Sequence, residues 1–85
     1  MNWQIEVTKT ATKQIKRFPK KDYLRVKDVI DEMRANPFFG DIQKIQGEEN
    51  TWRRRVGNYR IKYIVKIEIK SVYIFDIKRR TSSTY

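Results

Sequence analysis

The segment TWRRRVGNYRIKY, residues 51–63, decides the fold, because it has the pattern of two strands joined by a tight turn. Gly57 and Asn58 make a favourable two-residue hairpin turn, with glycine at the first central position of a type II′ turn. Three arginines precede the turn, and a fourth follows it almost at once. Like charges directly opposite one another destabilise a sheet. We therefore expect something outside the fold to compensate for them.

Pairing across this turn sorts the side chains onto two faces, because residues directly opposite share a face. The basic side chains lie on one face: Arg53, Arg55, Arg60 and Lys62. The apolar side chains lie on the other face: Val56, Tyr59, Ile61, Tyr63 and Val65. Arg54 has the parity of the apolar face, so we expect its long side chain to reach solvent at the sheet edge.

In the rest of the chain, the spacing of hydrophobic residues is that of a small α+β domain. Hydrophobic alternation predicts strands, and helical spacing predicts two helices between them. The predicted elements are a strand at 3–7, a helix from Thr8 or Thr10 to Phe18, a helix from Pro19 to Asn36, and strands at 51–56, 59–67 and 71–78. The order β-α-α-β-β-β predicts a helical hairpin packed on an antiparallel sheet. Residues 1–85 form one domain.

A four-residue turn at 67–70 would extend the basic face onto the last strand. Such a turn places residue 66 opposite 71, 62 opposite 75, and 60 opposite 77. This register predicts that Tyr73, Phe75 and Arg79 join the basic face. The alternative is ordinary solvated charge, which we expect for the lysines of the helices.

The composition limits which partners the protein can bind and which catalytic or metal-binding groups it can use. The chain has 20 Lys and Arg against 10 Asp and Glu, a net charge of +10, which attracts RNA, DNA, an anionic membrane or an acidic protein. Cysteine and histidine are absent, which removes thiolate sites and the usual general base, so we expect no metal or cofactor. No apolar run approaches the ~20 residues of a membrane span. Because Met1 leads directly into a structured-looking segment, we expect a soluble, cytoplasmic protein without a signal peptide.

Two segments, WRRRVGNYRIKY (52–63) and VYIFDIKRRTSSTY (72–85), resemble the core of the RelE/ParE toxin superfamily. The family pattern is a Trp or Tyr, alternating basic residues, a Gly-x-Tyr-Arg hairpin, two strands, and an Arg followed six residues later by Tyr. QKIQG at 43–47 is similar to the Lys-Leu-x-Gly that often precedes it. The resemblance covers essentially the whole chain and implies a toxin of a type II toxin–antitoxin pair. Its RelE branch cuts mRNA in the ribosomal A site without a metal, whereas its ParE branch poisons DNA gyrase.

The resemblance also implies roles for individual residues. The implied catalytic residues are Arg53, Arg55, Arg60, Arg79 and Tyr85. Arginine forks stabilise the extra negative charge at phosphorus. Arginine essentially cannot act as a base, and relatives carry lysines where this chain has Arg53 and Arg55, so the base stays open between Tyr85, Lys44 and Lys62. The expected RNA contacts are Lys44, Lys62, Arg80, Phe75, Tyr73 and Arg54.

These patterns together predict a ribosome-dependent mRNA endonuclease, and the Arg79–Tyr85 spacing favours this branch. The alternatives are a gyrase-directed toxin of the same fold and a basic nucleic-acid-binding module without catalysis. The expected partners are a cognate antitoxin with acidic and apolar residues, the ribosome and mRNA. We expect the toxin to be a monomer outside the toxin–antitoxin complex.

Overall fold

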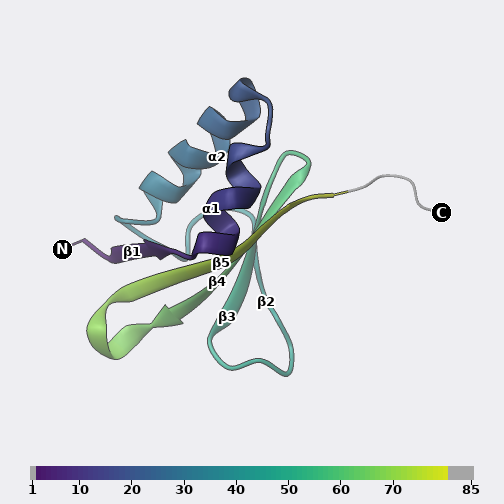
Figure 1. The fold of residues 1–85 in the computed structure, drawn as a ribbon. Coiled ribbons are helices and arrows are strands. Elements are labelled where there is room, and N and C mark those ends of the chain that lie inside the picture. The colour runs from purple at the N-terminus through teal and green to yellow at the C-terminus, as the bar shows by residue number, and fades with distance from the viewer. Residues whose placement is uncertain (1, 81–85) are drawn as a thin grey trace.

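The computed structural model describes residues 2–80, in which two helices cover one face of a five-stranded sheet (Figure 1). The elements are β1 (Gln4–Val7), α1 (Lys9–Lys16), α2 (Lys20–Glu32), β2 (Ile42–Lys44), β3 (Thr51–Val56), β4 (Tyr59–Lys66), a 3₁₀ turn (Ile67–Ile69) and β5 (Ser71–Arg79). The sheet order is β1-β5-β4-β3-β2. β1 runs parallel to β5, and all other neighbours are antiparallel. The predicted α+β class is confirmed, with one parallel pair added at the edge.

The helices begin where the sequence predicts, but they end earlier than predicted, α1 at Lys16 and α2 at Glu32. Thr8 caps α1, and its Oγ1 accepts a hydrogen bond of 3.1 Å from the backbone N–H of Ala11. Pro19 precedes the first turn of α2. One stripe of each helix is buried against the sheet: Ala11 and Ile15 from α1, and Val26, Val29 and Ile30 from α2. The helices therefore hold the sheet from one side only.

The hairpin at the centre of the sheet has the predicted turn and pairing. Gly57 has φ +58°, as the first central position of a type II′ turn requires. Arg55 lies opposite Arg60, and Arg53 opposite Lys62. The apolar face points at the helices, with these side chains at most 1 % exposed: Ile61, Tyr63, Val65, Val72, Ile74 and Ile77. Burial of each such side chain contributes about 1.5–3 kcal/mol to folding.

The predicted register of β5 is wrong beyond Tyr63. The pairing holds from Lys66 opposite Ser71 to Tyr63 opposite Ile74, and then shifts, so that Lys62 faces Asp76. Phe75 is the extra residue of this β-bulge. With strict alternation, Asp76 and Lys78 would face the helices and Ile77 would face away from them. Because of the bulge, Ile77 instead lies in the core, opposite Ile61.

The sequence did not predict β2. This strand has three residues, Ile42–Lys44, and two of them are polar and exposed. Backbone hydrogen bonds at its ends anchor it to β3: Arg55 N–H donates to the Asp41 carbonyl (3.0 Å), and Ile45 N–H donates to the Thr51 carbonyl (2.9 Å). A strand formed by backbone pairing at a solvated edge leaves no hydrophobic alternation in the sequence.

Tyr63 makes the stability of the fold sensitive to alkaline pH. Its hydroxyl donates to the Pro37 carbonyl (2.6 Å), and burial raises the pKa of Tyr63 to about 12, while the Arg54 charge opposes this rise. Tyrosine in the unfolded chain ionises near pH 10. The folded state therefore binds the extra proton above pH 10, and stability falls as the pH rises from about 10 to 12, by about 2–3 kcal/mol.

Urea unfolding of the wild type and Tyr63→Phe between about pH 9 and 12 measures this loss. Lysine titration affects both proteins alike, so the difference between their slopes isolates the Tyr63 hydroxyl. Equal slopes would contradict the prediction, whatever the absolute stability of Tyr63→Phe.

Candidate nucleic-acid interface

The face of the sheet away from the helices carries two rows of polar side chains that cross β2, β3, β4 and β5. The first row is Gln43, Arg53, Lys62 and Asp76, and the second is Asp41, Arg55, Arg60 and Lys78. Residues directly opposite share a face. We call the cations of these rows the basic face: Arg53, Arg55, Arg60, Lys62 and Lys78. Four of the five were predicted to lie together, and Lys78 was not.

A shallow cleft of about 110 Å³ lies within the basic face. Asp41, Gln43, Arg53, Arg55 and Arg60 line it. Pockets that enclose a whole small molecule measure roughly 300–1,000 Å³. The cleft is therefore suited to contact with one group of a larger polyanion, such as a backbone phosphate held by guanidinium forks.

Two residues at the β2 edge hold the arginines of β3. Arg55 Nε lies 3.0 Å from Asp41 Oδ2 in an ion pair. Arg53 Nη2 donates a hydrogen bond to Gln43 Oε1. Sequence reasoning missed both partners because it missed β2 itself. Asp41 supplies part of the compensation for like charge that the hairpin requires, and Gln43 gives Arg53 a neutral acceptor; both residues belong to the fold.

Asp76 provides a second carboxylate, at the opposite corner of the two rows. It lies opposite Lys62, and its Oδ1 accepts a hydrogen bond of 2.8 Å from Gln14 Nε2 of α1. Gln14 Oε1 in turn accepts from the backbone N–H of Ile77 at 2.7 Å. One glutamine thus ties α1 to the stretch of β5 that follows the bulge.

The prediction that the Arg54 side chain reaches solvent is wrong. It lies on the helix side, and its side chain is only 12 % exposed. Its Nη1 donates to the Phe39 carbonyl (2.8 Å), and its Nη2 lies 4.0 Å from Glu32 Oε1. A Cβ on Gly40 would come within 2.4 Å of the Arg54 guanidinium carbon, so this glycine permits the close approach. This position contradicts the predicted RNA contact.

Arg79 lies on the side of the sheet opposite to the predicted one. The bulge places it opposite Tyr59, with the apolar parity, and Lys78, instead of the predicted Ile77, lies opposite Arg60. Burial and the hydrogen bond to Asp22 raise the pKa of Tyr59, and the Arg79 charge opposes this rise. The catalytic role of Arg79 stays a prediction of the family resemblance.

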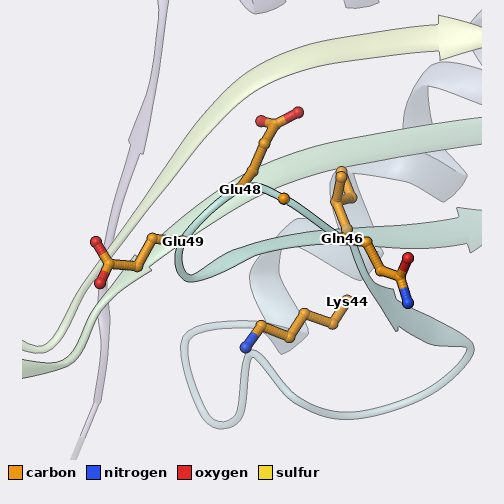
Figure 2. Close-up of a pocket in the computed structure, with 6 residues that line it drawn as sticks. Lys44, Gln46, Glu48 and Glu49 are labelled. Atoms are coloured by element: carbon orange, nitrogen blue, oxygen red, sulfur yellow. The ribbon is translucent and has the colours of Figure 1, made fainter.

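Lys44 lies opposite Trp52 and therefore has the parity of the helix side, away from Lys62. It lines an open hollow of about 650 Å³ with the loop residues Ile45, Gln46, Gly47, Glu48 and Glu49. The labelled side chains in Figure 2 point away from one another, so no polar groups converge there.

The two predicted aromatic residues, Tyr73 and Phe75, lie on β5. Tyr73 lies opposite Ile64, and the Lys66 ammonium stands 5.2 Å from the centre of its ring. Phe75 and Asp76 are consecutive half-buried residues between buried Ile74 and Ile77. This three-residue spacing between buried isoleucines is the sequence signal that could have revealed the bulge, and with it Lys78.

The last predicted site residues lie at the end of β5 or beyond the described chain. The backbone N–H of Arg80 donates to the Asn58 carbonyl at the hairpin turn. Tyr85 lies outside residues 2–80. Within those residues, no three His, Cys, Asp or Glu side chains gather as metal ligands. No helix of the described chain has the length and apolar character needed to cross a membrane.

Comparison with known proteins identifies the family. The family model described as ParE toxin of type II toxin-antitoxin system, parDE, matches residues 5–83. Toxin RelE3 of Methanocaldococcus jannaschii is 42% identical over 62 residues, which cover 68% of this chain and 70% of that protein. The RelE1 protein of the same organism is 28% identical over 83 residues, 94% of this chain and 92% of that protein.

A solved structure agrees with this assignment. The RelE of the archaeal RelE-RelB complex from Pyrococcus horikoshii OT3 superposes with a TM-score of 0.84 at 26% identity, covering 98% of this chain and 100% of that chain. The chain therefore belongs to the ParE toxin family of type II toxin–antitoxin systems. It is a RelE-like toxin of that family, as the resemblance of its two segments implied.

Proposed function

We propose that this toxin is a ribosome-dependent endoribonuclease that cleaves mRNA in the A site and acts in the cytoplasm. The observation that carries the proposal is the pair of cation rows on the uncovered face of the sheet, with the cleft between Arg53, Arg55 and Arg60. RNA cleavage without a metal requires the 2′-hydroxyl to lose its proton, the charge at phosphorus to be stabilised, and the 5′-oxygen to be neutralised. Arginines supply the second requirement.

The face of the sheet on which each lysine lies narrows the candidates for the general base. Lys62 belongs to the basic face, between Arg53 and Asp76, whereas Lys44 has the opposite parity. This arrangement supports Lys62 over Lys44. Tyr85 remains the alternative that the family resemblance implies.

Expression of the wild type followed by primer extension on cellular mRNA tests the proposal. Cuts in phase with codons would support the endonuclease. The family model carries the ParE description, which favours gyrase as the second candidate target. DNA breaks with intact mRNA would establish that alternative, and nucleic-acid binding without either lesion would indicate a non-catalytic module.

The proposed partner is an acidic antitoxin that neutralises the basic face. The relative from Pyrococcus horikoshii was solved as a complex with RelB, which supports a complex of this kind. Because the chain carries a net charge of +10, surface charge will contribute to binding. We expect affinity to fall between about 0.1 M and 1 M salt, over which the Debye length shrinks from ~10 to ~3 Å.

Titration of the toxin with its antitoxin across that salt range checks this expectation. Lys62→Ala and Lys27→Ala give a matched pair, since they remove one charge from the basic face and from α2 respectively. We expect the salt dependence to decrease more in Lys62→Ala. Affinity that does not change with salt would contradict the proposal and indicate an apolar interface.

A further inference from the structure

Asp41 is a carboxylate inside the basic face, and the proposed chemistry gives it no task. It contacts Arg55 twice, since its carbonyl accepts from the Arg55 backbone N–H (3.0 Å) and its Oδ2 pairs with Arg55 Nε (3.0 Å). It also lines the cleft that Arg53, Arg55 and Arg60 share. A negative charge in this position occupies one edge of a guanidinium that would otherwise hold phosphate.

The ion pair is open to water. The Arg55 and Asp41 side chains are 53% and 63% exposed, respectively. Exposed pairs of this kind hold their partners weakly, so a phosphate can displace the carboxylate. After displacement, the carboxylate still lies near the incoming phosphate and repels it.

Arg53 shows the contrasting arrangement one row away. Its partner from β2 is Gln43, an amide that satisfies one of the guanidinium N–H groups without adding negative charge. Arg53 and Arg55 therefore sit in the same cleft, two residues apart on β3, with a neutral partner and an anionic partner. The difference between the two partners is one unit of charge at the cleft.

We propose that Asp41 is an internal counterion of Arg55 that an RNA phosphate must displace, and that it determines specificity by weakening the binding of RNA that lacks further contacts. The inference rests on the proposed function, because it assumes that the cleft receives RNA. In the free protein, Asp41 relieves the repulsion between Arg55 and Arg60. In the presence of RNA, it limits the affinity of the basic face for unselected strands.

Two reciprocal variants test this inference. Asp41→Asn keeps an acceptor for Arg55 Nε and removes the charge, whereas Gln43→Glu adds a carboxylate beside Arg53. The probe is a single-stranded RNA with 2′-O-methyl groups, which can bind but lacks the attacking hydroxyl. Asp28→Asn is the control, because it makes the same change in net charge at an exposed position on α2.

We expect Asp41→Asn to bind this RNA roughly 3- to 10-fold more tightly than wild type at low salt. Unit charges about 4 Å apart interact by about 1 kcal/mol in water, and 1.4 kcal/mol is about tenfold. Gln43→Glu should bind more weakly by a similar factor, and Asp28→Asn should change little. All differences should shrink near 1 M salt, where the Debye length is about 3 Å.

Equal or weaker RNA binding by Asp41→Asn, with a folded protein by circular dichroism, would overturn the inference. So would a Gln43→Glu variant that binds like wild type, because a carboxylate beside an arginine of this cleft would then have no effect on RNA affinity. These outcomes are separate from failure of the proposed function. That failure would appear as intact mRNA with the wild-type toxin, whatever the binding of the methylated RNA.

Discussion

Arg60→Ala is expected to reduce mRNA cleavage by ~10²–10³-fold and to leave the fold intact. Arg60 lies at the centre of the second row, between Arg55 and Lys78, and it lines the cleft. A donor aimed at the charge that develops in the transition state has an effect of this size. Removal of the Arg60 side chain opens no cavity in the core. It also removes the repulsion between Arg60 and the two cations opposite it, Arg55 and Lys78.

Cleavage of an mRNA held by an A-site-empty ribosome provides the measurement, with urea unfolding of the same samples as the check on folding. Arg17→Ala is the matched control, because Arg17 is an exposed arginine at the end of α1. We expect the control to cleave at nearly the wild-type rate. Wild-type cleavage by Arg60→Ala would refute the site, and its unfolding would refute the assignment of Arg60 to the uncovered face.

The second large effect is dependence on the ribosome: free mRNA should be cleaved at least ~10²-fold more slowly than the same mRNA in the A site, where the reacting groups are positioned. The chain has no histidine, and tyrosine and lysine ordinarily titrate near 10 and 10.4, far above neutral pH. On an uncovered sheet face, water and salt also screen the cations. Ribosomal RNA laid over that face would exclude water and hold the reacting groups in line.

A comparison of one mRNA, free and in an A-site-empty ribosome, over a pH series measures this dependence. The free RNA should still bind, with strong salt dependence, even where it is not cut. Equal cleavage rates in the two settings would show that the toxin alone contains a complete active site. That result would contradict ribosome dependence, but it would not contradict the assignment of the five cations to the basic face.

The central hairpin could be predicted because local chemistry determines it. Gly57 fixes the turn, the turn fixes the pairing, and a side-chain period of two then assigns Arg53 and Arg60 to one face. Each step depends on neighbours in the chain. The same reasoning left the cap of α1 open between Thr8 and Thr10, and the structure places it at Thr8, where the hydroxyl accepts from an N–H three residues on.

The failures concern features that depend on contacts far apart in the sequence. The Arg54 side chain donates to the Phe39 carbonyl, fifteen residues earlier in the chain. The predicted face of Arg54 was therefore correct, but its predicted exposure to solvent was wrong. Gln43 belongs to β2 and Asp41 immediately precedes it, and this short strand pairs with β3 without a hydrophobic pattern in the sequence. For Arg79, one unrecognised residue in β5 reversed the assigned face of every residue after it.

The bulge in β5 has a consequence for how this strand changes during evolution. Removal of Phe75 would leave Ile74, Asp76 and Ile77 in regular alternation, with each later residue still opposite its present partner. The strand thus contains a one-residue insertion whose side chain is only half-buried. An alignment with a bulge-free relative needs a gap at Phe75, since without it Lys78 would be matched to a core position. At this point the chain can gain or lose an aromatic group on its outer surface while its hydrophobic interior stays the same.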